Sequence, residues 1–65
     1  MDDKEGWRAH FEGAEVLEEQ NGCKLYHEQG FFAVCAPGVE PGDADSYITG
    51  AREIAFEWLE QMAAG

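Results

Sequence analysis

Residues 23–36, CKLYHEQGFFAVCA, decide the fold, because they hold two strand-like runs around a single tight turn. The runs cover residues 23–28 and 31–36, and each is rich in apolar side chains. Gln29 and Gly30, which separate them, are typical of a two-residue loop between antiparallel strands. The stretch therefore predicts a β-hairpin.

The two-residue loop determines which side chains face one another across this hairpin. It places Leu25 opposite Val34 and His27 opposite Phe32. Because side chains on a strand alternate between faces, Leu25, Val34 and Phe32 share one face. A helix is expected to cover that face.

A third strand precedes the hairpin over residues 14–19 and is joined to it by residues 20–22, Gln-Asn-Gly. A three-residue loop that ends in a glycine with positive φ places Leu17 opposite Leu25, on the face to be covered. A two-residue loop would instead put Glu18 there, and a slip by one residue exchanges all side chains between faces. The three-residue loop is preferred for this reason.

The C-terminal third of the chain predicts a long amphipathic helix. It is capped by Asp43 or Asp45 and runs to about Ala63. At about 100° per residue its apolar side chains fill one stripe, the one large apolar surface able to cover the sheet. The stripe consists of Tyr47, Ile48, Ala51, Ile54, Ala55, Trp58, Leu59 and Met62.

Together these elements predict an α+β fold. A short N-terminal helix, capped by Asp2 or Asp3 and packing through Trp7 and Phe11, is followed by a three-stranded antiparallel β-meander. The long C-terminal amphipathic helix packs on the sheet. Since the sequence has no repeat, linker or low-complexity tract, residues 1–65 are expected to form a single compact domain.

The composition is strongly acidic, with 14 Asp and Glu against 4 Lys and Arg and a formal net charge of −10. So few cations cannot build the basic patch needed to bind DNA, RNA or anionic lipid directly. No apolar run approaches the ~20 residues of a membrane span, and the N-terminal sequence does not have the pattern of a signal peptide. A cytoplasmic location is expected.

Residues able to catalyse reactions or bind metals do not form a known constellation. Cys23 and His27 share a strand face but lie ~13 Å apart, too far to hold one ion, and no cysteine pair has zinc-knuckle spacing. Cys23 and Cys35 are expected on opposite faces as reduced thiols. Ser46 is expected in the first turn of the last helix, His10 is close to neither cysteine in the sequence, and His27 is expected beside Phe32 rather than beside a nucleophile. We therefore expect no metal, no cofactor and no enzymatic activity.

The acidic residues gather in three groups that point to a protein-binding role. On the last helix Glu53, Glu57 and Glu60 project together, opposite the apolar stripe, and Phe56 lies among them. Phe56 is either an exposed anchor for a partner or a ring buried by the N-terminal helix or by residues 38–42. The other candidate partner-binding residues are Glu12, Glu15, Glu18 and Glu19 in one group and Glu40, Asp43 and Asp45 in another.

Rows of carboxylates on a rigid domain can occupy a basic groove built for nucleic acid. Duplex DNA carries one charge per ~1.7 Å of axis, and helical glutamates four residues apart lie ~6 Å apart along the helix, comparable to phosphates on one strand. Electrostatic steering to a basic partner would be fast and would depend strongly on salt. The expected partner is therefore a basic nucleic-acid-binding protein or complex.

In length, charge, element order and the absence of a catalytic constellation, the chain resembles the small phage-encoded anti-CRISPR proteins that are acidic mimics of double-stranded DNA. The resemblance covers the whole chain as a profile, without a motif. It implies a non-catalytic inhibitor that binds a CRISPR surveillance complex and blocks its access to target DNA.

A second resemblance is local. GFFAVCAPG (residues 30–38) followed by AREIAFEWLE (residues 51–60) is similar to the strand-then-helix half of HicB-type antitoxins, which neutralise a small basic toxin ribonuclease. Here the strand expected between them is shortened to residues 38–42, and no DNA-binding segment follows. Two alternatives of other kinds remain. The acidic surface could serve only solubility or high-salt adaptation. The chain could also be a structural or subunit-binding module, either a monomer or a weak dimer that forms through an open sheet edge or through Val16 and Tyr26.

Overall fold

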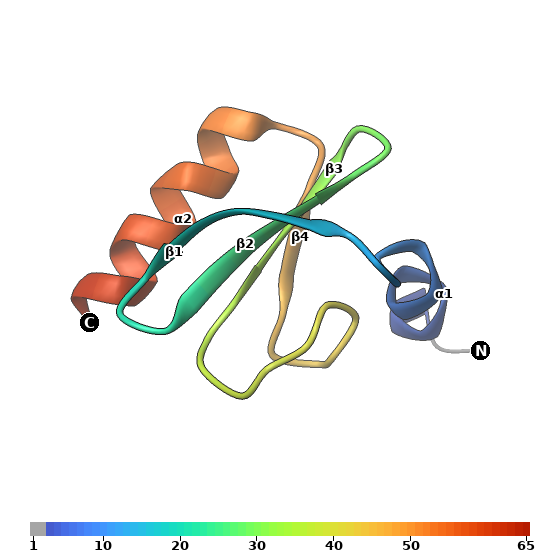
Figure 1. Ribbon diagram of the computed structural model, residues 1–65, viewed down its shortest axis with the longest axis horizontal. Helices are drawn as coiled ribbons and strands as arrows, with labels where there is room; N and C mark the ends of the chain where they lie inside the picture. Colours follow the sequence, from blue (N-terminus) through green and yellow to red (C-terminus); the bar gives the residue numbers. More distant parts are fainter. Residues whose placement is uncertain (1–2) are drawn as a thin grey trace.

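Four antiparallel strands form one sheet in the order β1-β2-β3-β4, with helix α2 against one face and helix α1 at one end (Figure 1). The computed structural model describes residues 3–65, with side chains from residue 6 onward. The predicted cap depends on the side chain of Asp2 or Asp3, and neither side chain belongs to the described part of the chain. The α+β class and the helix–sheet–helix order are confirmed, but the sheet has four strands rather than three. The elements are α1 (Asp3–His10), β1 (Glu15–Gln20), β2 (Cys23–Glu28), β3 (Phe31–Cys35), β4 (Tyr47–Thr49) and α2 (Arg52–Ala64).

The central hairpin of β2 and β3 has the predicted register. Leu25 pairs with Val34 and His27 pairs with Phe32. Positive φ at both loop residues, 45° at Gln29 and 84° at Gly30, defines the two-residue turn that matches the twist of the strands.

The predicted register between β1 and β2 is wrong. Asn21 and Gly22, with φ of 51° and 85°, form a two-residue turn, and Glu18 pairs with Leu25. A bulge between Val16 and Glu18 then shifts the register by one residue. Leu17 is the extra residue in this bulge, and its side chain still packs against the core under α2.

The predicted start of the C-terminal helix is also wrong. Residues 47–49 form β4 at the edge of the sheet beside β3, and α2 begins only at Arg52. Asp43 and Asp45 therefore do not cap it. The N-cap residue is Ala51, whose backbone N–H donates to the Thr49 hydroxyl (3.1 Å).

Two apolar clusters lie on opposite faces of the sheet. Ala55 and Leu59 of α2 are fully buried against Leu25 and its neighbours on one face. On the other face, Phe11, directly after α1, packs with residues of β3. The buried residues of the first cluster are Cys23, Leu25, Phe32, Val34, Ala55 and Leu59, and those of the second are Phe11, Ala33 and Cys35. The two cysteines thus lie on opposite faces, as predicted.

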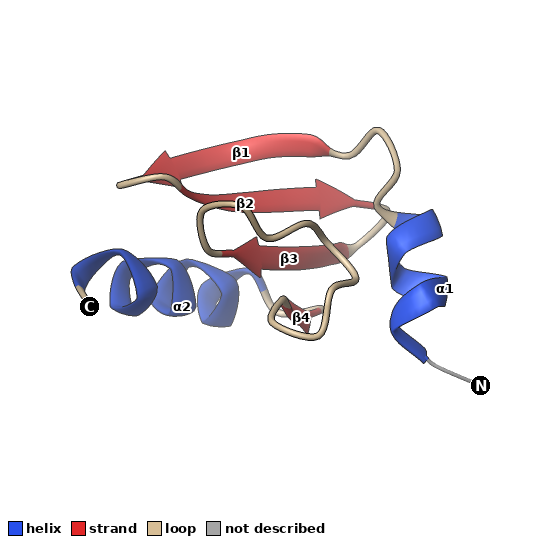
Figure 2. Cartoon of the chain, turned by 90° about the horizontal axis from the view of Figure 1, so that it is seen from below, coloured by secondary structure: helices blue, strands red, loops and turns tan. Residues whose placement is uncertain are grey.

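Helix α1 is held at the end of the sheet, away from α2 (Figure 2). The Trp7 ring lies 4.9 Å from the Phe31 ring, measured between centroids, and His10 Nε2 lies 2.9 Å from the carbonyl oxygen of Glu28. These contacts join α1 to the β2–β3 turn.

Candidate protein-binding surfaces

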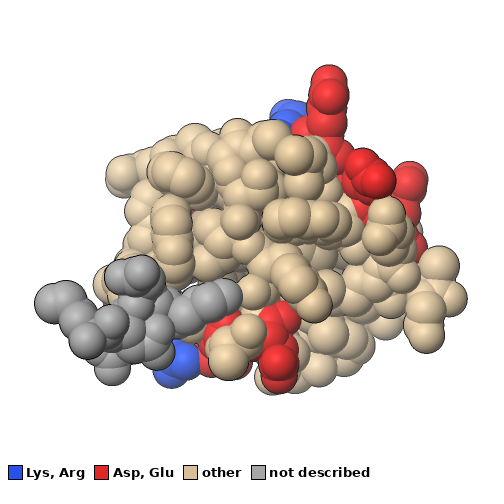
Figure 3. Space-filling view, turned by 180° about the vertical axis from the view of Figure 1, so that it is seen from behind, with Lys and Arg blue, Asp and Glu red and all other residues tan. Residues whose placement is uncertain are grey.

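Helix α2 presents a row of carboxylates on its outer side. Glu53, Glu57 and Glu60 are all exposed, whereas Ala55 and Leu59 on the opposite side are buried. Gln61 Nε2 donates to Glu57 Oε1 (3.2 Å) within the same row. Figure 3 shows acidic side chains gathered over α2, as the sequence predicted for these three residues.

The cations do little to neutralise this row. Arg8 pairs with Asp43, which is the one ion pair among the side chains of residues 6–65. The Arg52 guanidinium lies 5.3 Å from the centroid of the Phe56 ring. Lys24 lies across the strands from Glu19. The α2 glutamates therefore have no cationic partner within the described side chains.

Phe56 is half-buried rather than exposed. Its ring packs against the cluster under α2, and Arg52 covers part of it. The burial comes from the sheet itself and not from α1 or residues 38–42, the two segments considered from the sequence. Helix α2 is turned so that Phe56 and Trp58 lie on the two flanks of its buried side.

The glutamates near β1 do not form one cluster. Glu15 pairs with His27, and Glu18 pairs with Leu25. Paired residues share a face of the sheet, so both carboxylates lie toward the α2 side. Glu19 pairs with Lys24 and points to the other side. The fourth residue of this predicted group, Glu12, is exposed just after α1.

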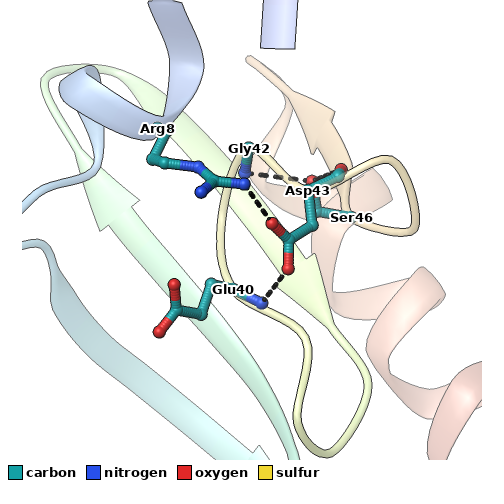
Figure 4. Close-up of polar contacts among 5 residues, drawn as sticks. All are labelled: Arg8, Glu40, Gly42, Asp43 and Ser46. Atoms are coloured by element: carbon teal, nitrogen blue, oxygen red, sulfur yellow. Dashed lines mark hydrogen bonds and ion pairs between the residues drawn. The ribbon is translucent and has the colours of Figure 1, made fainter. Parts of the chain in front are cut away.

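Among the acidic residues of the loop, Asp43 has a structural role (Figure 4). Asp43 Oδ1 pairs with Arg8, and Asp43 Oδ2 accepts a hydrogen bond from the backbone N–H of Glu40 (3.0 Å). The Ser46 hydroxyl accepts from the Gly42 N–H (3.1 Å) and donates to the Asp43 carbonyl (2.7 Å). The Arg8 pair ties residues 40–46 to α1, and the other three bonds hold the loop together internally. Glu40 and Asp45 are exposed.

Sequence reasoning missed an apolar groove between β4 and α2. The Tyr47–Trp58 groove, with a volume of about 430 Å³, is lined by Tyr47, Trp58, Gln61 and Met62. The two rings lie 5.7 Å apart between centroids, and Tyr47 is 53% exposed. Ile54, one turn before Trp58, is 42% exposed. The spacing of Ile54, Trp58 and Met62 was visible in the sequence, but all three were expected to be covered by the sheet.

A second cleft, of about 790 Å³, lies between α1 and residues 40–42, above Tyr26 of β2. It is open and mostly polar, with Arg8, Glu12 and Glu40 at its walls. Among the described residues, no group of three or more His, Cys, Asp or Glu side chains is placed so that it could hold a metal ion. None of the helices in the described part of the chain has the length and apolarity to cross a bilayer.

Comparisons of the chain with protein-family models, with curated proteins and with solved structures return no significant match.

Proposed function

We propose that this protein is a non-catalytic inhibitor that binds a nucleic-acid-binding protein by presenting carboxylates in place of DNA phosphates. The observation that carries the proposal is the row of Glu53, Glu57 and Glu60, which is exposed on a rigid helix and has no ion pair within the described side chains. The specific target proposed is a CRISPR surveillance complex of a bacterial host. The protein would be phage-encoded and would block binding of target DNA.

The geometry of α2 supports a match to phosphates. Its buried residues Ala55 and Leu59 fix the helix on the sheet, so the backbone positions that carry the outer carboxylates are held at a defined spacing. Glu53 and Glu57 are ~6 Å apart along the axis, and Glu57 and Glu60 are ~4.5 Å apart. Because the backbone of the helix is already ordered, only the Glu side chains must become ordered when they enter a basic groove, which favours binding.

The net charge of −10 supports fast association with such a groove. Glu15 and Glu18 lie on the α2 side of the sheet and extend the negative field toward β1. Binding is therefore expected to weaken steeply as salt rises.

Charge reversal tests the proposal. The triple variant Glu53→Lys, Glu57→Lys, Glu60→Lys changes the net charge by 3 × 2 = 6, from −10 to −4. Tagged protein is used to capture partners from a CRISPR-bearing bacterial lysate at low and high salt. Wild type is expected to retain a nucleic-acid-binding complex that added duplex DNA displaces, and the variant is expected to bind it about 100-fold more weakly or worse.

A second triple variant, Glu15→Lys, Glu18→Lys, Glu19→Lys, has the same net charge but leaves α2 intact. It is expected to lose much less affinity, because the row on α2 remains. Equal recovery by wild type and the α2 variant would show that these glutamates serve solubility alone. Capture of one small basic ribonuclease, insensitive to duplex DNA, would favour an antitoxin function instead.

A further inference from the structure

The two edges of the sheet differ in their protection against pairing with another strand. At the β1 edge, a bulge interrupts the ladder, and Glu15, Glu18 and Glu19 add exposed charges. Both features oppose association of strand edges. At the other edge, β4 carries neither charge nor proline, and its pairing with β3 contains no bulge. Among residues 3–65, no further strand pairs with β4.

An exposed apolar surface borders the β4 edge. Tyr47 projects from β4 itself, and the Tyr47–Trp58 groove continues onto α2, with Ile54 alongside. Figure 3 views the molecule from this side and shows a broad surface without Lys, Arg, Asp or Glu between two acidic areas. The edge and the groove thus form one continuous uncharged face on a chain with 14 acidic residues, with no charged side chain in its lining and Glu57 at its rim, where Gln61 donates to it.

We propose that this uncharged face binds a second copy of the chain, with the two β4 strands paired antiparallel. Charge argues for this occupant. A basic partner is attracted to carboxylates, which this face does not offer, whereas another copy with a net charge of −10 can approach closely only where carboxylates are absent. The inference does not depend on the proposed function.

The symmetry of such a pair is simple. Two antiparallel β4 strands are related by a two-fold axis perpendicular to the sheet, which makes the contact isologous. The two sheets join into one, and both α2 helices remain on the same face of it. Tyr47 and Trp58 of each copy then lie beside the joint.

The size of the contact sets its strength. A typical stable interface covers about 800 Å² per partner, which is about a fifth of the 4195 Å² surface of this chain. A strand of 3 residues and one groove cover less than that. The dimer is therefore expected to be weak, with a dissociation constant on the order of 100 μM.

Sedimentation equilibrium of the full chain tests the proposal over protein concentrations from micromolar to near-millimolar. Wild type is expected to be a reversible dimer that tightens several-fold between low and high salt, because salt screens the repulsion between the copies. Binding of a basic partner is expected to weaken as salt rises. The dimer and the proposed function therefore give different results, and either can be wrong without the other.

The variants Ile54→Lys and Tyr47→Ser change exposed side chains of the face and are expected to weaken the dimer at least tenfold. Val16→Lys is the matched control: Val16 is 44% exposed, close to the 42% of Ile54, but lies on β1. It is expected to dimerise like wild type, and circular dichroism verifies that all three variants fold. Three results would each overturn the proposal: a wild type that stays monomeric at both salts, a dimer that weakens with salt, or equal losses in the Val16 and Ile54 variants.

Discussion

Replacing Gly42 with alanine is expected to lower the free energy of unfolding by about 3 kcal/mol. Gly42 is buried and has a φ of 95°, a region that L side chains rarely adopt. A Cβ atom built there would lie 2.6 Å from the backbone nitrogen of Arg8 and 2.7 Å from its Cα. Backbone atoms cannot rotate away, so α1 and the loop would have to separate. Urea unfolding measures the loss.

Gly38→Ala is the matched control for this change. Gly38 has a similar φ of 81°, but an added Cβ would meet no atom within 4 Å. The fall in the free energy of unfolding for Gly38→Ala is therefore expected to come from the backbone conformation alone and to be about 1 kcal/mol. If the two variants lost the same stability, the close packing of Gly42 on α1 would be refuted.

Truncation of Leu59 to alanine is expected to remove about 3 kcal/mol or more of stability, within the range observed for buried leucines. Leu59 is fully buried and packs α2 against the sheet. Since domains of this size are only marginally stable, much of the variant should be unfolded at 37 °C. Thermal unfolding followed by circular dichroism reports this as a large fall in Tm.

Ile54→Ala, on the same helix, provides the comparison. Ile54 is 42% exposed, and its truncation is expected to cost less than about 1 kcal/mol when measured at low micromolar concentration. A larger loss for Ile54 than for Leu59 would mean that α2 packs on the sheet through a different side.

The β-hairpin could be predicted from the sequence because local turn chemistry determines it. Gln29-Gly30 supplies the two positive φ angles, and the register of β2 and β3 follows from the loop length. The β1–β2 register could not be obtained in the same way. Its turn also has two residues, and this places the polar Glu18 opposite Leu25. The fold tolerates this pairing because the bulge lets Leu17 pack against the core in its place. A bulge leaves no clear mark in a single sequence.

Strand β4 was mistaken for the first turn of a helix because Tyr47 and Ile48 fit the helical period of the residues that follow. The signals for a strand were the β-branched and aromatic residues of Tyr47-Ile48-Thr49 and the glycine after them. Because residues 47–49 belong to β4 and not to α2, the buried side of α2 is centred on Ala55 and Leu59. This is why Phe56 turns toward the core.

The exposure of the α2 glutamates could be predicted, since it depends only on helical spacing. The role of Asp43 could not, because its partner Arg8 lies 35 residues away in the chain. The Tyr47–Trp58 groove was missed for the same reason as β4: it exists only where the edge strand meets α2.

Competition with DNA tests the central claim most directly. Binding of labelled target duplex to a purified CRISPR surveillance complex is measured at constant salt. The binding curve is repeated at a series of increasing concentrations of the protein. The apparent dissociation constant for DNA is expected to rise in proportion to protein concentration. The variant that reverses Glu53, Glu57 and Glu60 is expected to need about 100-fold more protein, or more, for the same rise. Unchanged DNA binding at a hundredfold excess of wild type, across complexes of different types, would contradict the account.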